Sequence, residues 1–151
     1  MIESVEKICG TPGLGMSPRR ITVSTAGIAK AIKRLGDDEV KFNLALSLHA
    51  ANDEKRSEIM AINDTNNLMV LADALKYFYE KTGTRITYEY IIFKDFNDST
   101  QDAWELAEFC KNVPCKINII EYNPIDNGEF EQADKVNAEN IEIAIRRLDL
   151  E

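Results

Sequence analysis

Small polar side chains and the single histidine stand where the apolar stretches of this sequence end. Ser24-Thr25 closes the first stretch, Ser47 and His49 close the second, Asn97-Asp98 follow the third, and Asn123 follows the fourth. These hydroxyl, amide and imidazole groups form hydrogen bonds, and strong acids and bases are scarce among them. Such a set suits binding a zwitterionic, ribose-bearing ligand better than hydrolysing one.

Four stretches read as strands, at residues 20–25, 44–48, 85–93 and 115–120, and each is followed by a helical pattern. Helices are expected after Gly27, from residue 52, from 68 to 83, from Ser99 with Asp102 in a capping box, and from an Asn137 cap to Leu148. Strands alternating with helices predict parallel βαβ units, whose strands end at one common edge.

The fold class predicted is therefore α/β, either an open sheet or an arc of a (β/α) barrel. Complete barrels need about 250 residues, so a chain of 151 residues would form an incomplete one. Residues 42–50, which contain the second predicted strand, form an apolar run with little alternation. Such a run predicts a strand covered on both faces.

Charge and composition narrow the function classes. A net charge of −8 argues against strong nucleic-acid binding by these residues alone. Basic residues concentrate only at Arg19-Arg20 and at Lys30, Lys33 and Arg34. No apolar segment is long enough for a membrane span and the first seven residues are polar and acidic, so a cytoplasmic location is expected. Cys9, Cys110 and Cys115 are expected to be free thiols.

Several enzyme classes lack their motifs here. The sequence has no Ser-His-acid order, no Walker loop and no Gly-x-Gly-x-x-Gly. Glu89 and Glu121 are interpreted as solvated or structural carboxylates. Two alternatives stay open: a Schiff-base enzyme using Lys94 or Lys116, and a ligand-binding or interaction module without catalysis.

The motifs closely resemble the RlmN/Cfr family of radical S-adenosylmethionine (SAM) RNA methyltransferases. The resemblance runs collinearly through residues 19–27, 45–53, 59–63, Asn97-Asp98, 114–120 and Asn123-Pro124. It implies a partial (β/α)6 barrel that holds SAM and a 4Fe-4S cluster. It also implies methylation at C2 of an adenine in 23S rRNA and, in some members, in tRNA.

The resemblance also implies roles for particular residues. Ser24, Ser47, Leu48, His49 and Asn123 match the SAM-contacting positions of the family, Leu48 through its backbone. No residue of this chain matches a catalytic acid or base, a catalytic cysteine or a metal ligand of the family.

Parts of the family pattern are not found in these residues. The sequence lacks the Cys-x-x-x-Cys-x-x-Cys cluster loop, the Gly-Glu-Pro segment, the amino-terminal RNA-binding domain and the methyl-carrying carboxyl-terminal cysteine. Glu121 stands where many members have proline. We therefore expect residues 1–151 to form one domain, strands three to six of a radical SAM barrel. We expect no methyltransferase activity from it alone, and self-association through an exposed barrel edge.

Overall fold

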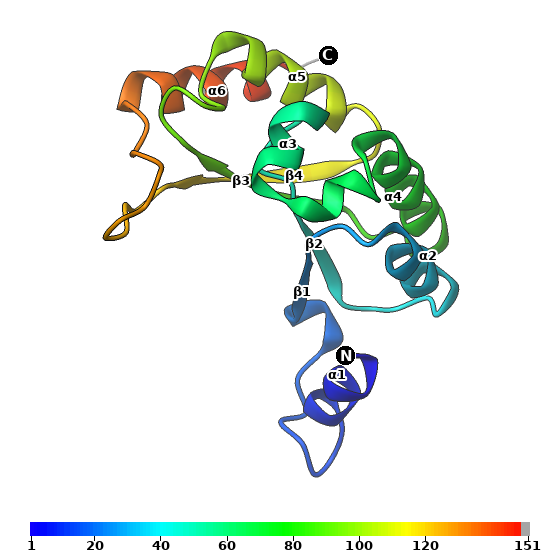
Figure 1. Cartoon of the computed structure of the whole chain (residues 1–151). Helices are drawn as coiled ribbons and strands as arrows, with labels where there is room; N and C mark the ends of the chain where they lie inside the picture. Colours follow the sequence, from blue (N-terminus) through cyan, green and yellow to red (C-terminus); the bar gives the residue numbers. More distant parts are fainter. Residues whose placement is uncertain (149–151) are drawn as a thin grey trace.

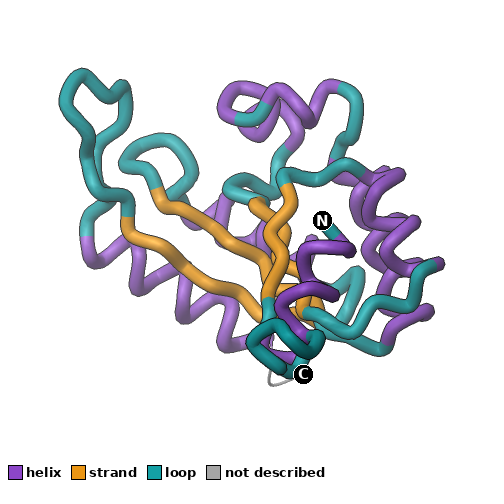
Figure 2. Tube along the Cα trace, turned by 90° about the horizontal axis from the view of Figure 1, so that it is seen from below, coloured by secondary structure: helices purple, strands orange, loops and turns teal. Residues whose placement is uncertain are grey.

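Four parallel strands form a single open sheet. The computed structural model describes residues 1–148. The strands β1 (Thr22–Thr25), β2 (Asn43–Ser47), β3 (Ile86–Ile92) and β4 (Cys115–Glu121) lie side by side in the order β1-β2-β3-β4. In Figure 2 the sheet does not close into a ring. The incomplete barrel expected from the alternating pattern is confirmed.

Within residues 1–148 of the chain, one helix precedes the strands, four lie between them and one follows them (Figure 1). They are α1 (Ile2–Cys9), α2 (Ala29–Asp37), α3 (Asp53–Ile59), α4 (Leu68–Thr82), α5 (Thr100–Cys110) and α6 (Lys135–Leu148), with short 3₁₀ turns η1 (Pro18–Arg20) and η2 (Ala61–Asp64). Because each strand is followed by a helix that returns the chain, all four strands end at the same edge of the sheet. We name this edge the carboxyl rim.

Local sequence signals explain where most of these helices begin and end. The Ser99 side chain and the Asp102 side chain form the predicted capping box of α5. Asn67 caps α4, and Gly83 ends it with a left-handed φ of 65°. The predicted Asn137 cap is wrong: α6 already begins at Lys135. The carbonyl of Asp134 accepts the amides of residues 137 and 138. The predicted place of the Leu148 side chain lies outside the described side chains.

The two faces of the sheet differ in what covers them. One face carries Leu44, Leu46, Ile86, Tyr88, Tyr90 and Ile92, which are fully buried in the core with apolar residues of α2, α4 and α5. The other, which we call the inner face, carries Thr22, Ser24, Asn43, Ala45, Ser47, Thr87, Glu89, Ile91, Lys116, Asn118 and Ile120.

Helices therefore cover only the first face, and the expectation that β2 is covered on both faces is wrong. Asn43 and Ser47 keep partial exposure on the inner face, and only the small Ala45 is fully buried there. Asn43 and Ser47 stand among apolar residues in the sequence, so the alternation that marks an uncovered face is hard to recognise there.

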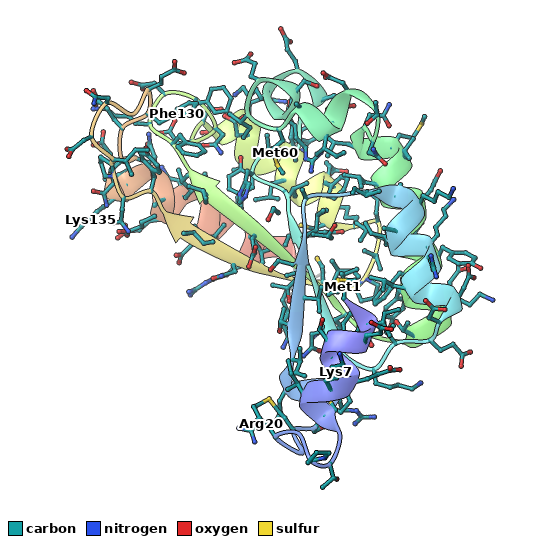
Figure 3. All side chains as sticks on the ribbon, turned by 60° about the horizontal axis from the view of Figure 1, so that its bottom comes forward. Met1, Lys7, Arg20, Met60, Phe130 and Lys135 are labelled. Carbon is teal, nitrogen blue, oxygen red and sulfur yellow. The ribbon has the colours of Figure 1, made fainter. Side chains whose placement is uncertain are left out.

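The two ends of the molecule are chemically distinct. Arg19 and Arg20 lie in η1, immediately before β1, and so at the end of the sheet opposite the carboxyl rim. Figure 3 places Lys7 and Arg20 at one end of the molecule and Met60 and Phe130 at the other. Within residues 1–148, no helix has the length and hydropathy of a membrane span.

Candidate functional site

A buried arginine joins the ends of β1 and β2. Arg56 is fully buried, and its Nε donates to the carbonyl of Leu48 at 3.1 Å. Its Nη2 donates to the carbonyls of Ala26 at 2.8 Å and Ser47 at 3.2 Å. Burial lowers the pKa of Arg56, while the charge of the nearby Asp53 opposes that shift. The guanidinium group thus connects the backbone that follows β1 to the end of β2 at the carboxyl rim.

A buried asparagine holds this arginine in place. Asn63 Oδ1 accepts from Arg56 Nη1 at 2.8 Å, and Asn63 Nδ2 donates to Asp53 and to Ser57 Oγ. Arg56 is not among the site residues predicted from the sequence. One sequence signal could have drawn attention to Arg56. It is a charged residue four positions before Met60, on the side of the helical segment where apolar residues are expected.

His49 lies at the carboxyl rim with its backbone in the left-handed region, which is strained for a residue with a side chain. Its φ is 57°, and its Nδ1 accepts the backbone N–H of Ile91 at 3.1 Å. Desolvation, followed by the positive charge of Arg56, lowers the His49 pKa to about 4. The ring is therefore neutral at pH 7. Because Nδ1 is an acceptor, the proton lies on Nε2, which is left as a hydrogen-bond donor.

Two serines lie on the inner face beside this histidine. Ser47 Oγ donates to Glu89 Oε2 over 3.4 Å, a long bond that a ligand hydroxyl could replace. Ser24 lies one strand away on the same face, opposite Ala45 in the register, and is exposed. Their hydroxyl groups are accessible to a ligand on this face.

Leu48 differs from its neighbours because its side chain is fully buried. Its amide donates to the carbonyl of Glu89 at 3.0 Å, and its carbonyl accepts from Ala50 and from Arg56. Its backbone would therefore reach a ligand only by sharing a group that already has a partner.

The asparagine and aspartate that follow β3 are structural, which corrects their expected place among ligand-binding groups. Asn97 is fully buried; its Oδ1 accepts from the Phe93 amide at 2.7 Å, and its Nδ2 donates to the carbonyls of His49 and Ile91 at 2.7 and 2.8 Å. Asp98 is also buried and accepts from Asn137 Nδ2 at 2.9 Å. Asn97 therefore ties the loop after β2 to the loop after β3.

Asn123 lies in the β4–α6 arm, which we define as residues 122–134. The arm extends past the end of the sheet, orange at the left of Figure 1. Its returning part is fixed by a bridge between Phe93 and Gln132 and by stacking of Phe130 on Phe93, with ring centroids 4.4 Å apart. Asn123 itself is exposed, and no residue within 1–148 hydrogen-bonds its side chain.

The structure thus brings together some of the predicted residues. Ser47, Leu48 and His49 form one segment held by Arg56 and Asn97, and Ser24 shares the inner face with Ser47. Asn123 follows the end of β4 at the same rim, and within residues 1–148 its side chain makes no hydrogen bond to the others. Their contact with SAM stays a prediction.

The cysteines and lysines offer no second kind of site. Cys9 lies in α1, whereas Cys110 and Cys115 flank the loop between α5 and β4. In the described part of the chain, no three Cys, His, Asp or Glu side chains gather as metal ligands. These residues therefore do not fit an iron–sulfur cluster, which needs several thiolates held together. Lys94 pairs with Glu131 at 3.6 Å and Lys116 is exposed, so neither lies in the apolar enclosure of a Schiff-base lysine.

Comparison with known proteins gives many similar sequences. The chain is 52% identical, over 97% of its length, to a protein of Christiangramia forsetii named as a probable dual-specificity RNA methyltransferase RlmN. It is 57% identical, over 86% of its length, to a protein of the same name from Cytophaga hutchinsonii. The chain spans only 44% and 36% of these two curated relatives. No protein-family model matches it.

Solved structures agree with these relatives. A radical SAM methyltransferase from Sphaerobacter thermophilus superposes with a TM-score of 0.93 at 32% identity, covering 97% of this chain and 43% of that one. A domain of a pyruvate-formate lyase-activating enzyme from Bacteroides vulgatus superposes with a TM-score of 0.71 at 14% identity, covering 98% and 84% respectively. The second likeness shows the fold alone. The family resemblance drawn from the motifs is confirmed.

Proposed function

We propose that this chain, whose sequence is similar to part of proteins named as RlmN methyltransferases, contributes part of the SAM-binding site of a radical SAM enzyme that methylates adenine C2. Its substrates would be 23S rRNA and tRNA. The observation that carries the proposal is the position of Ser47 and a neutral His49, two residues apart at the carboxyl rim, beside an uncovered polar sheet face. In parallel α/β folds, ligands bind at this end of the strands.

The groups at the rim complement a zwitterionic nucleoside. The hydroxyls of Ser24 and Ser47 both donate and accept, so they match ribose hydroxyls or the carboxylate of an amino acid. The His49 Nε2–H donates to an acceptor of the ligand, and the Asn123 amide can pair with the edge of a purine base. Leu48 occupies the position between Ser47 and His49 and holds its backbone against β3. SAM bound here would supply the methyl group.

The remaining chemistry requires groups that these residues do not provide. Cluster ligands and the methyl-carrying cysteine would come from other parts of the enzyme, since this chain spans under half of its relatives. The chain by itself is expected to bind SAM without transferring a methyl group. In this proposal residues 1–151 are one domain, strands three to six of the barrel, and the enzyme acts in the cytoplasm.

Self-association follows from the unpaired edges of the sheet. β1 and β4 each have one neighbour, so each leaves a row of backbone groups without a partner in the sheet. Multi-angle light scattering of the chain should show dimers or larger species. A monomer at all concentrations would remove this part of the proposal.

Titration calorimetry of the 151-residue chain with SAM tests the binding site. We expect saturable binding that weakens in Ser47→Ala and remains unchanged in Ser4→Ala, a matched control on the exposed face of α1. Binding of SAM by the wild-type chain with equal affinity in both variants would place the ligand elsewhere. Absence of binding would contradict a SAM site formed by these residues alone.

A further inference from the structure

We propose that Arg56 is a positioning residue of the SAM site: it fixes the backbone of residues 47–49 so that Ser47 and His49 present their polar groups together. This inference rests on the proposed function for the identity of the ligand. Arg56 does not lie on the inner face and would touch no ligand. It would act through the carbonyls of Ala26, Ser47 and Leu48, which it binds.

The geometry of the guanidinium group explains why an arginine is needed. In this forked group, Nε donates to the carbonyl of Leu48, and Nη2 donates to the carbonyls of Ala26 and Ser47. Nη1 donates to the side-chain oxygen of Asn63. Lysine offers three donors on a single atom and cannot reach acceptors on several sides of a planar group. The Arg56 fork therefore sets the relative positions of the ends of β1 and β2.

The backbone around the fork is adapted to it. Gly27 has a φ of +107°, and a Cβ atom there would lie 3.2 Å from Arg56 Nη2 and 3.1 Å from the Leu71 side chain. A glycine at this position lets the chain leaving β1 pass close to the guanidinium group. Asn63, fully enclosed on the other side, holds Nη1 at 2.8 Å.

Stability alone does not account for this charge. Arg56 is in no salt bridge among residues 1–148. Its hydrogen bonds go to carbonyl and amide oxygens, and the nearby Asp53 supplies the opposite charge without direct contact. Burying a charge without an ion pair is costly, even where hydrogen bonds compensate part of that cost. Fixing the backbone at the carboxyl rim would explain why a charged residue occupies this buried position.

The charge also reaches the neighbouring imidazole. Arg56 disfavours protonation of His49 and so supports the neutral ring whose Nε2–H is a donor. On the side of β3, the ring faces the Ile91 amide, and Glu89 is the acidic side chain of that strand. The effects of the hydrogen-bond geometry and of the charge can therefore be measured separately. A lysine at position 56 keeps the positive charge but not the hydrogen-bond geometry of the guanidinium group.

The test uses Arg56→Lys and Arg56→Gln in the 151-residue chain, with Arg34→Gln on the exposed surface of α2 as the control. Three readouts are compared: SAM affinity by calorimetry, the fold by circular dichroism, and the imidazole resonances followed against pH by NMR. Because His49 is the only histidine, its resonance needs no assignment.

We expect Arg56→Lys to fold, to bind SAM about tenfold more weakly, the net contribution of roughly one hydrogen bond, and to keep a low His49 pKa. Arg56→Gln should weaken SAM binding further and raise the His49 pKa, and Arg34→Gln should change neither. Folded Arg56 variants that bind SAM within about twofold of the wild-type chain would overturn the proposal.

Two remaining outcomes are also decisive. If neither Arg56 variant folds, the arginine is a stability residue and the proposal is wrong. If the wild-type chain binds no SAM, the proposed function fails, and the NMR readout still decides whether Arg56 orders the rim. In that case one sharp His49 signal in the wild-type chain and several in Arg56→Lys would support the ordering role, and identical signals would refute it.

Discussion

The segment after β2 and the arm after β4 lie at the same rim but are held in different ways. Residues 47–49 are bonded from both sides, by Arg56 and by Asn97. The β4–α6 arm is held by ring contacts of Tyr122 and Phe130 with Phe93. Backbone contacts of Glu131 and Gln132 hold it where it returns. The Asn123 side chain lies between these supports and is exposed.

This difference separates two kinds of ligand contact. A side chain already held in one conformation loses little entropy when a ligand binds, whereas an exposed side chain must be ordered by the ligand itself. In the proposed site, Ser47 and His49 would already be positioned for a ligand, and Asn123 would be ordered by the ligand. The predictions below ask whether each segment depends on its supports as this comparison requires.

The largest effect is expected from removing the support shared by the loops after β2 and β3. Asn97→Ala would leave the Phe93 amide and the carbonyls of His49 and Ile91 without their side-chain partner in a buried site. The expected loss in the free energy of unfolding is about 3 kcal/mol, measured by urea denaturation. The matched change Asn123→Ala removes no hydrogen bond within residues 1–148 and should leave stability within about 0.5 kcal/mol. Equal losses for both variants would contradict the comparison.

Acid should weaken the fold through His49. The folded pKa of about 4 lies below the ordinary histidine value of 6.5. Between these values the unfolded state therefore binds a proton that the folded state does not. Stability attributable to His49 is therefore complete above the higher pKa and falls as pH decreases, by at most about 1.4 kcal/mol per pH unit.

Comparing the wild-type chain with His49→Asn isolates this contribution from that of the carboxylates. Asparagine tolerates the left-handed backbone that His49 adopts at a φ of 57°. Urea denaturation from pH 7 to pH 4.5 should show a shallower dependence in the variant. The same slope in both chains would mean that His49 is not held neutral by the fold.

Removing the aromatic contact of the returning part of the arm should lower the free energy of unfolding less and loosen only the arm. Phe130→Ala removes ring contacts with Phe93 and Phe96, and the expected cost is about 1 kcal/mol. A protease that cleaves after glutamate should cut the variant faster at Glu129 or Glu131. Unchanged cleavage would show that the arm does not depend on this aromatic cluster.

The smallest expected change in stability accompanies a measurable change in binding. Asn123→Ala should weaken SAM binding about threefold or more, because an exposed amide that orders on the ligand contributes less than a preformed contact. Calorimetry with SAM measures this, and Asn140→Ala, another exposed asparagine, is the control. A loss as large as that of Ser47→Ala would show that the arm is already ordered without ligand.

The sequence predicted the arrangement of strands better than the function of individual polar residues. Alternating strands and helices gave the parallel order, and Ser99 with Asp102 marked the start of α5, because both signals are local. Asn97 follows a strand in a polar loop, so the sequence suggested a ligand-facing amide. Its actual partners are backbone groups that only the folded chain brings together. Arg56 was missed for the same reason.

The faces of β2 show a second limit. Apolar residues flank Ala45, and its small side chain disappears from solvent even on the uncovered face. Burial of one residue by its neighbours cannot be distinguished in sequence from burial under a helix. The register with Thr87 and Glu89 on β3 identifies the inner face, and register is a property of the sheet.

The order β1-β2-β3-β4 also bears on how the chain could fold while it is being synthesised. Every strand pairs with the strands adjacent to it in sequence, and none is inserted between two earlier ones. A growing chain could therefore add each strand and its helix to the edge just completed, as the ribosome releases them. Arg56, which follows β2, would then lock the first two strands together before β3 has been translated.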